Sequence, residues 1–269
     1  MITTLERQLL ASPRRTWYRL IITLIAIVLI GWSVGAISFK DVNQSGFQIA
    51  LNILKGIIHP DLDLLFNVSK QGILYLLVQT VAIAFLGTIV GGILSVPLAF
   101  LAASNVVPKP VAWLTRLLLI VIRTIPELVY GLMLIKVTSP GPFAGVLTIG
   151  ITSIGMLAKL YVDAIEELDV KVLESMTSIG CTTFEKIRYG IMPQLLSVFL
   201  SVTIYRFDMN MRDASILGLV GAGGIGAPLI FAMSSYKWSQ AGSILIGLVV
   251  LILLIELVSN KMRAKLVKG

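Results

Sequence analysis

Five stretches of this chain are long and apolar enough to cross a lipid bilayer as helices. A bilayer core about 30 Å thick takes roughly 20 apolar residues in helical conformation. The stretches are residues 20–39, 72–103, 111–137, 143–158 and 238–255. A sixth stretch, 194–212, begins apolar and becomes polar from Arg206. Only 13% of the residues are charged, against about a quarter in soluble domains, so we predict an all-α integral membrane protein with six transmembrane helices.

The lysines and arginines indicate an orientation for these spans. Basic residues collect on the cytoplasmic side of membrane proteins. If both termini are cytoplasmic, fourteen of the 22 basic residues fall in cytoplasmic segments and five in outer segments. The remaining three, Arg123, Arg206 and Arg212, lie at membrane depth. We therefore expect a multi-pass protein with both termini in the cytoplasm.

The first 71 residues combine one span with a polar segment. Ser12-Pro-Arg14-Arg15 before an apolar run is also typical of a twin-arginine export signal. The run is longer than most signal peptides and five further spans follow it, which favours a retained membrane helix. Apolar residues between 47 and 58 have partly helical spacing, so we expect an amphipathic helix at the outer surface. The chain accordingly divides into residues 1–71 and a membrane core of residues 72–269.

Several function classes lack the residues that they would need. His59 and Cys181 are the only histidine and cysteine, which leaves almost nothing for a metal site and excludes an intrachain disulfide. The formal charge of +8 is dispersed between apolar spans, so no nucleic-acid surface is expected. The chain has no phosphate-binding G-x-x-x-x-G-K-[ST] motif and no nucleophile-base constellation. We expect no enzymatic activity, no metal and no cofactor in this chain.

The connection over residues 159–193 contains two predicted helices around a glycine corner. Leu168, Val172, Met176 and Ile179 form an apolar stripe on a first helix over 165–179. Gly180 suits the left-handed position that ends such a helix. Thr182 and Glu185 have capping-box spacing and start a second helix, which places Phe184, Ile187 and Ile191 on one side. This cytoplasmic knob either docks a partner or rests on lipid headgroups.

The same connection resembles the coupling loop of ABC importer permeases. Glu174, Ser175, Met176, Gly180 and Pro193 stand at the spacing of that family's E-A-A, three residues, G, nine residues, I-x-L-P signature. Ser175 and Met176 replace its two alanines, while Gly190 and Met192 replace its isoleucine and leucine. The resemblance implies a type I importer permease core of the bacterial inner membrane. It assigns contact with the cytoplasmic ATPase to Glu174, Ser175, Met176, Gly180 and Pro193.

Further motifs over roughly residues 70–260 look like the permease subunit of phosphonate-uptake ABC transporters. They are residues 123–129, 141–147, 155–160 with 164–166, 188–190 with 193–194, and 206–207 with 217–226. That resemblance implies transport of phosphonates or related small phosphorus oxyanions. It also implies three partners, namely a second copy of the chain, cytoplasmic ABC ATPase subunits and an extracytoplasmic substrate-binding protein.

The run Gly221-Ala-Gly223-Gly224-Ile-Gly226 satisfies the dinucleotide pattern G-x-G-x-x-G. A dinucleotide site needs a βαβ unit and an acidic residue about 20 positions further on. The first acidic residue after Gly226 is Glu256, near the end of the last span. Glycines in membrane segments otherwise allow close packing or a turn beside a cavity. We expect these four glycines to serve close packing or a gate, two hypotheses that the sequence leaves open.

Buried charges form two predicted clusters. Arg123 lies within the third span, where an unpaired arginine costs about 2.5 to 3.5 kcal/mol, and Glu127 lies one turn away. Arg206, Asp208 and Arg212 form the second cluster, with Asp208 and Arg212 on one helical face. These charges are either internal ion pairs or a path for an anion. With the resemblance, Arg206 and Arg212 become candidate pathway residues and Arg123 a structural one.

The sequence thus predicts the pore-forming permease subunit of an ATP-driven importer for phosphonates or related oxyanions. One alternative is an importer permease for another small solute, such as an amino acid or an inorganic oxyanion. A membrane oxidoreductase that used the glycine run, and an energy-independent channel, are alternatives from other classes. The docking loop argues against a channel, because a passive pore needs no contact with an ATPase.

Overall fold

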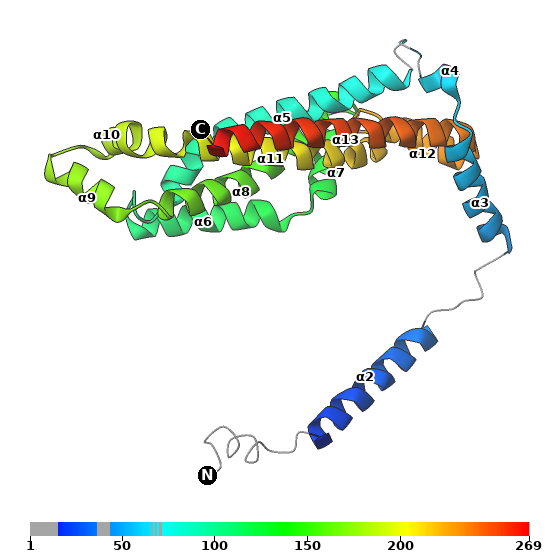
Figure 1. The fold of residues 1–269 in the computed structure, drawn as a ribbon, viewed down its shortest axis with the longest axis horizontal. Helices are drawn as coiled ribbons and strands as arrows, with labels where there is room; N and C mark the ends of the chain where they lie inside the picture. Colours follow the sequence, from blue (N-terminus) through cyan, green and yellow to red (C-terminus); the bar gives the residue numbers. More distant parts are fainter. Residues whose placement is uncertain (1–15, 37–43, 66, 68, 70–71, 269) are drawn as a thin grey trace. The chain divides into compact units, whose positions relative to one another are not determined.

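The computed structural model describes residues 16–36, 44–65, 67, 69 and 72–268. All regular structure in these ranges is helical (Figure 1). The helices are α2 (Thr16–Ala36), α3 (Gln44–Ile58), α4 (Leu62–Leu65), α5 (Ile73–Ala102), α6 (Lys109–Thr124), α7 (Glu127–Thr138), α8 (Pro142–Glu166), α9 (Val170–Ser178), α10 (Thr183–Glu185), α11 (Met192–Leu219), α12 (Gly226–Ser234) and α13 (Trp238–Lys268). A π-helical turn, η2 (Lys186–Ile191), joins α10 to α11. The predicted all-α class is confirmed.

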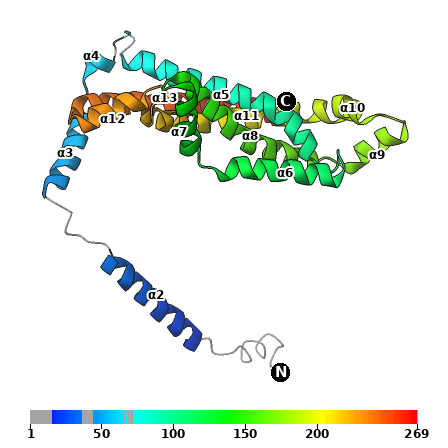
Figure 2. The same cartoon turned by 180° about the vertical axis from the view of Figure 1, so that it is seen from behind.

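The chain forms two compact units, residues 1–51 and 52–269. The first contains the apolar helix α2 and the beginning of α3, so the predicted helix near residues 47–58 is present. In the second unit α5, α8, α11 and α13 run alongside one another, and Figure 2 shows the same helices from behind. The loop that carries α9 and α10 projects at one end of this unit.

Four helices of the described chain are long and apolar enough to cross a membrane. They are α5, α8, α13 and the 37-residue stretch Thr183–Leu219, which joins α10, η2 and α11. The pair α6 and α7 adds a fifth if it counts as one span. The apolar part of α2, Trp17–Ser33, is a shorter helix. The described residues therefore contain four to five candidate spans by length and composition, and the sixth span stays a prediction.

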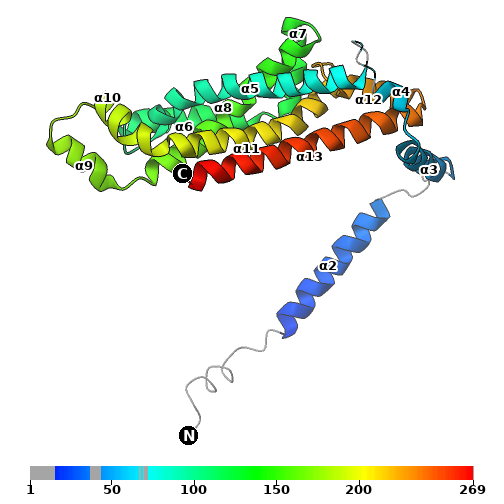
Figure 3. The ribbon, with the colours of Figure 1, turned by 45° about the horizontal axis from the view of Figure 1, so that its top comes forward.

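The predicted span over residues 111–137 is bent, because α6 and α7 meet at an angle of 85°. The break falls at Ile125 and Pro126, whose backbone ψ angles of 123° and 143° are extended. A proline disfavours helical backbone in the residue before it and has no N–H for the helical ladder. Pro126 instead caps α7, and Figure 3 shows α7 turned away from the direction of the long helices.

Small residues bring α5 and α8 close together. A Cβ atom added to Gly87 would lie 2.6 Å from Ile149, and one added to Gly91 would lie 2.7 Å from the Cβ of Ser153. Small residues stabilise packed membrane helices because backbones can approach closely and gain van der Waals contact. This packing fixes α8 as the central helix against which the polar side chains of α6, α7 and α11 are placed.

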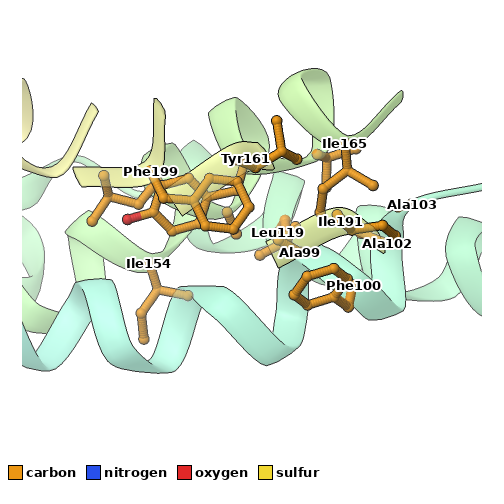
Figure 4. Close-up of a cluster of buried hydrophobic side chains, with 14 of the residues drawn as sticks. Ala99, Phe100, Ala102, Ala103, Leu119, Ile154, Tyr161, Ile165, Ile191 and Phe199 are labelled. Atoms are coloured by element: carbon orange, nitrogen blue, oxygen red, sulfur yellow. The ribbon is translucent and has the colours of Figure 1, made fainter. Parts of the chain in front are cut away.

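The largest buried cluster lies next to the projecting loop (Figure 4). Tyr161 of α8 stacks on Phe199 of α11 with ring centroids 4.3 Å apart, and Phe100 of α5 meets Phe199 edge-on. Leu173 of α9 and Ile191 of η2 belong to the same cluster. The loop is therefore anchored on the membrane core through its apolar residues, and it is not a free appendage.

Candidate functional site

The corner of the projecting loop is a helix-ending turn centred on Gly180. Gly180 has a φ of 85°, a left-handed conformation that glycine adopts without a Cβ penalty. The backbone N–H of Cys181 donates to the Met176 carbonyl and that of Gly180 donates to the Thr177 carbonyl, both at 3.0 Å. These two bonds define a Schellman motif. The left-handed role predicted for Gly180 is confirmed.

The next helix begins with the predicted capping box. The Thr182 backbone N–H donates to Glu185 Oε2 at 2.7 Å, and the Glu185 backbone N–H donates to Thr182 Oγ1 at 3.4 Å. From Thr183 the helix continues through the π turn into α11 without interruption. Pro193 does not break it, because it directly follows the π turn, in which the Met192 N–H donates to the Ile187 carbonyl and the regular i→i−4 ladder is already shifted.

The predicted start of the first loop helix is wrong. Ile165 and Glu166 belong to the end of α8, and α9 begins only at Val170. Asp169 caps α9 by accepting a hydrogen bond from the Lys171 backbone N–H at 3.0 Å. An aspartate side chain stabilises a new helix start at such a position, which separates the two helices.

The exposed apolar face of the loop only partly matches the predicted stripe, of which Ile179 remains exposed. Leu168 packs against the buried cluster, and Met176 lies against Gly190, where an added Cβ would come within 2.5 Å of its sulfur. The side chains that face outward are Ile179, Phe184 and Tyr189, which are 78%, 67% and 66% exposed. We call these three residues the loop face. Glu174, Ser175, Gly180 and Pro193 are exposed on the same loop and start of α11.

A buried polar network lies in the middle of the second unit and is centred on Arg206 of α11. Arg206 is only 6% exposed, and its Nε donates to Ser153 Oγ of α8 at 3.2 Å. Asn210, one turn on, donates from Nδ2 to Ser153 Oγ at 2.9 Å and to Thr88 Oγ1 of α5 at 2.7 Å. Three membrane helices are therefore joined by side-chain hydrogen bonds. Ser153 and Thr88 were missed by sequence reasoning, because single hydroxyls in apolar spans give little signal.

Two carboxylates lie beside the Arg206 guanidinium. Glu127 Oε2 is 3.9 Å from one terminal nitrogen, and Asp213 Oδ2 is 3.6 Å from the other. Both distances exceed those of charge-assisted hydrogen bonds, so these pairs are loose. The 85° break directs Glu127 toward α11, and the expectation that Glu127 compensates Arg123 is therefore wrong.

Asp208 and Arg212 form a separate ion pair on α11. Arg212 Nη2 lies 2.6 Å from Asp208 Oδ2, which confirms that the two residues share a helical face. The Asp208 side chain is 7% exposed, whereas that of Arg212 is 50% exposed. Within the described residues, three buried oxygens accept no hydrogen bond, namely Glu127 Oε1, Asp208 Oδ1 and Asn210 Oδ1. Unsatisfied acceptors are rare in protein interiors, and polar clusters that retain them are candidate functional sites.

Arg123 is not part of this network. It lies in the last turn of α6, is exposed, and extends along α8 past Gly155, where an added Cβ would come within 2.5 Å of its Cγ. Ser153 and Met156, by contrast, contact Arg206. The structure thus separates Arg123 from the charged residues around Arg206.

The glycine run connects α11 to α12 and follows a helix, not a strand. Gly221, Gly223 and Gly224 have φ angles of 95°, 84° and 77°. The Gly224 N–H donates to Gln79 Oε1 and the Ile225 N–H donates to Thr80 Oγ1, each at 3.0 Å, so α5 satisfies the turn. Gly226 lies where an added Cβ would come within 2.3 Å of the Ser215 carbonyl oxygen. The geometry is that of a tight turn held against α5.

Comparison with known proteins assigns this architecture to a family. Residues 95–268 match the family described as binding-protein-dependent transport system inner membrane component. Over 190 residues the chain is 38% identical to the phosphate-import permease protein PhnE of Mycolicibacterium smegmatis, a match that covers 70% of this chain and 36% of that longer protein. It is 32% identical over 188 residues to the phosphite transport system permease protein PtxC of Stutzerimonas stutzeri, covering 70% of this chain and 68% of the relative.

A solved structure shares the fold. A chain of the MetNI methionine ABC transporter, in an inward-facing conformation, superposes with a TM-score of 0.64 at 20% identity. The superposition covers 71% of this chain and 96% of that chain. The common fold confirms the predicted importer-permease architecture of the membrane core.

Proposed function

Since the chain belongs to the family of binding-protein-dependent transport system inner membrane components, the permeases of ABC importers, we propose that it forms the pore for phosphonates or related small phosphorus oxyanions. The permeases that it resembles are named for phosphate and phosphite. A further relative, 32% identical over 117 residues, is a putative cryptic phosphonate transport system permease protein of Escherichia coli. The solutes in these names are all tetrahedral phosphorus oxyanions. This shared substrate class is the single observation on which the substrate proposal rests.

The projecting loop is the proposed contact with a cytoplasmic ATPase. Its loop face exposes three large apolar side chains to the surroundings, and exposed apolar surface of this kind marks interaction sites. Glu174, Ser175, Met176, Gly180 and Pro193 keep their proposed coupling role. Because the loop is anchored on Tyr161 and Phe199 through Leu173 and Ile191, movement of the ATPase would be passed on to the membrane helices.

The polar network is the proposed route of the anion. Arg206 and Arg212 supply positive charge, and Glu127 and Asp208 hold that charge in place. Among the described residues, no carboxylate lies within hydrogen-bond distance of Arg206, so both terminal nitrogens of its guanidinium can still donate to an oxyanion. We propose that the network binds the anion only weakly during passage, because tight binding would slow release of the anion.

The remaining assignments complete the proposal. Two copies of the chain would enclose the pore, with six spans each and both termini in the cytoplasm. A substrate-binding protein would deliver the anion at the outer side. Residues 1–71 would form an accessory segment and residues 72–269 the permease core. Gly221, Gly223, Gly224 and Gly226 would shape a gate or a packed turn beside the pore.

Uptake in reconstituted vesicles tests the substrate. The full chain is reconstituted with its cognate ATPase and binding protein, and ATP-dependent uptake of radiolabelled methylphosphonate, phosphite, phosphate and methionine is measured. We expect at least one phosphorus oxyanion to be transported and methionine not to be. Uptake of methionine alone would overturn the substrate assignment and favour an importer for another small solute.

A second experiment tests the loop. Gly180→Pro places a fixed negative φ at a residue that needs a φ of 85°, so the loop corner cannot form. We expect the variant to insert normally and to lose most ATP-driven uptake, while the ATPase continues to hydrolyse ATP. Gly35→Ala, at a site with no atom within 4 Å of an added Cβ, serves as the control. Normal uptake by Gly180→Pro would contradict the coupling role.

A further inference from the structure

A second cationic site lies along the half of α8 that leads to α9, beyond the residues that contact Arg206. A groove of about 280 Å³ runs between α6 and α8. Its charged lining consists of Arg116 and Arg123 from α6 and Lys159, Asp163 and Glu166 from α8. Three cations therefore face two carboxylates, which leaves one positive charge in excess.

Each of the two carboxylates in the groove already forms an ion pair with one of the cations. Glu166 pairs with Arg116 and also accepts hydrogen bonds from the backbone and side chain of Ser104. Asp163 pairs with Lys159, with Nζ and Oδ2 2.8 Å apart. Among the described residues, Arg123 forms no ion pair and no side-chain hydrogen bond, so the excess charge of the groove is that of Arg123.

The groove is shaped so that Arg123 can lie along it. Gly155 has no side chain where the Arg123 stem crosses α8, and any Cβ there would come within 2.5 Å of Arg123 Cγ. Arg123 lies seven residues from Arg116, which is about 10 Å along α6 at 1.5 Å per residue. Arg116 donates from Nε to the carbonyl of Ala102 at the end of α5, so the groove begins at the helix ends and extends toward the middle of the bundle.

The chemistry of the groove selects a class of ligand. An arginine fork and a nearby lysine recognise tetrahedral phosphorus oxyanions through charge-assisted hydrogen bonds. Leu119 and Val162 supply apolar walls beside these cations. An anionic ligand would supply the negative charge that Arg123 lacks at a depth where an uncompensated charge is unfavourable.

We propose that the groove between α6 and α8 binds a phosphorus oxyanion through Arg123 and Lys159, at a site separate from Arg206. The oxyanion is the phosphodiester of an anionic phospholipid or a small free anion, and both present the same tetrahedral oxygens. The lipid form is independent of transport, whereas the free-anion form rests on the proposed function.

Binding to the purified full-length chain tests the site and distinguishes the two sources. Phosphatidylglycerol and phosphatidylcholine are added in equal amounts to the detergent-solubilised protein, and retained lipid is counted by native mass spectrometry. In parallel, the thermal unfolding midpoint is measured against inorganic phosphate and methylphosphonate, since a ligand of the folded state raises that midpoint. Selective retention of phosphatidylglycerol identifies the lipid source, and an anion-dependent midpoint identifies the free anion.

Variants locate the binding in the groove. We expect Arg123→Gln and Lys159→Gln each to weaken the observed binding about tenfold, and Lys136→Gln, which removes an exposed cation of α7 outside the groove, to leave it unchanged. Should Arg123→Gln fail to fold, Arg123→Lys keeps the charge without the fork and should bind several-fold more weakly. The proposal is overturned if the wild type retains neither ligand selectively, or if the groove variants bind as the wild type does.

This readout does not require transport. If reconstituted uptake fails while phosphatidylglycerol is retained through Arg123, the proposed function is wrong and the proposed binding site in the groove is supported. If uptake of an oxyanion succeeds while the groove variants bind as the wild type does, the proposed binding site is wrong and the proposed function is supported.

Discussion

Arg206 and Arg123 both reach α8 from neighbouring membrane helices, yet their surroundings are opposite. The Arg206 side chain is 7% exposed, with a hydroxyl acceptor and two carboxylates around it. Arg123 is exposed and lies in a groove whose carboxylates pair with other cations. The difference teaches that an arginine in an apolar span can be buried among polar groups of the fold or can lie exposed in a groove between two helices. Position along the sequence does not distinguish the two cases.

The largest expected effect comes from removing the internal charge. Arg206→Met leaves Glu127 and Asp213 without their cation, and breaking a buried ion pair by removing one partner costs about 3 to 5 kcal/mol. We expect a loss of that size in the unfolding free energy, measured by chemical denaturation in detergent.

A charge-neutral variant separates stability from transport. Combining Arg206→Met with Glu127→Gln and Asp213→Asn removes the uncompensated carboxylates, so most of the lost stability should return. Under the proposed function, oxyanion uptake should remain low in this triple variant. If uptake returned together with stability, Arg206 would serve packing alone.

A smaller effect is expected at the hydroxyl that joins the helices. Ser153 Oγ accepts from both Arg206 Nε and Asn210 Nδ2, so Ser153→Ala leaves Arg206 Nε without its acceptor, while Asn210 keeps Thr88 Oγ1. An unsatisfied buried group costs about 1 to 3 kcal/mol, and we expect a decrease in unfolding free energy within that range.

The matched control for this variant is Ser178→Ala. The Ser178 hydroxyl is exposed and donates only to the Glu174 carbonyl of its own helix, as far as the described residues show. We expect its unfolding free energy to equal that of the wild type. Equal effects of the two alanine variants would mean that the network contributes no stability.

The smallest effect is expected at the open groove. Arg123→Gln breaks no ion pair or side-chain hydrogen bond among the described residues, so its unfolding free energy, measured without added anionic lipid or phosphate, should change by less than about 1 kcal/mol. A loss comparable to that of Arg206→Met would erase the contrast between the two arginines. It would point to a compensating contact for Arg123 made by a second copy of the chain.

Features governed by local chemistry could be predicted from the sequence. Gly180 and the pair Thr182 and Glu185 act through hydrogen bonds within a few residues, and their predicted conformations are the observed ones. The pairing of Asp208 with Arg212 follows from one helical turn. Apolar runs likewise predicted the helices α5, α8, α11 and α13, because a membrane requires backbone hydrogen bonds to be satisfied within each segment.

Features that depend on the arrangement of separate helices could not be predicted. Pro126 was visible, but a proline in a membrane span can produce a mild kink or a full break, and packing decides which. Because of that break, Glu127 lies beside Arg206, a residue 79 positions away, and not beside Arg123. Ser153 gained its importance only through the approach of α11. The start of α9 was a different case, because Asp169 carried a local capping signal that the apolar stripe obscured.

The unbroken helix from Thr183 to Leu219 has a mechanical consequence. Glu185 of the capping box and Arg206 are 21 residues apart on it, which is about 31 Å at 1.5 Å per residue. One continuous helix thus has the loop corner near one end and the buried Arg206 guanidinium further along, with the π turn as its only irregular part among the described residues. Tilting the loop end of this helix by a few degrees would therefore change the position of Arg206 relative to Ser153.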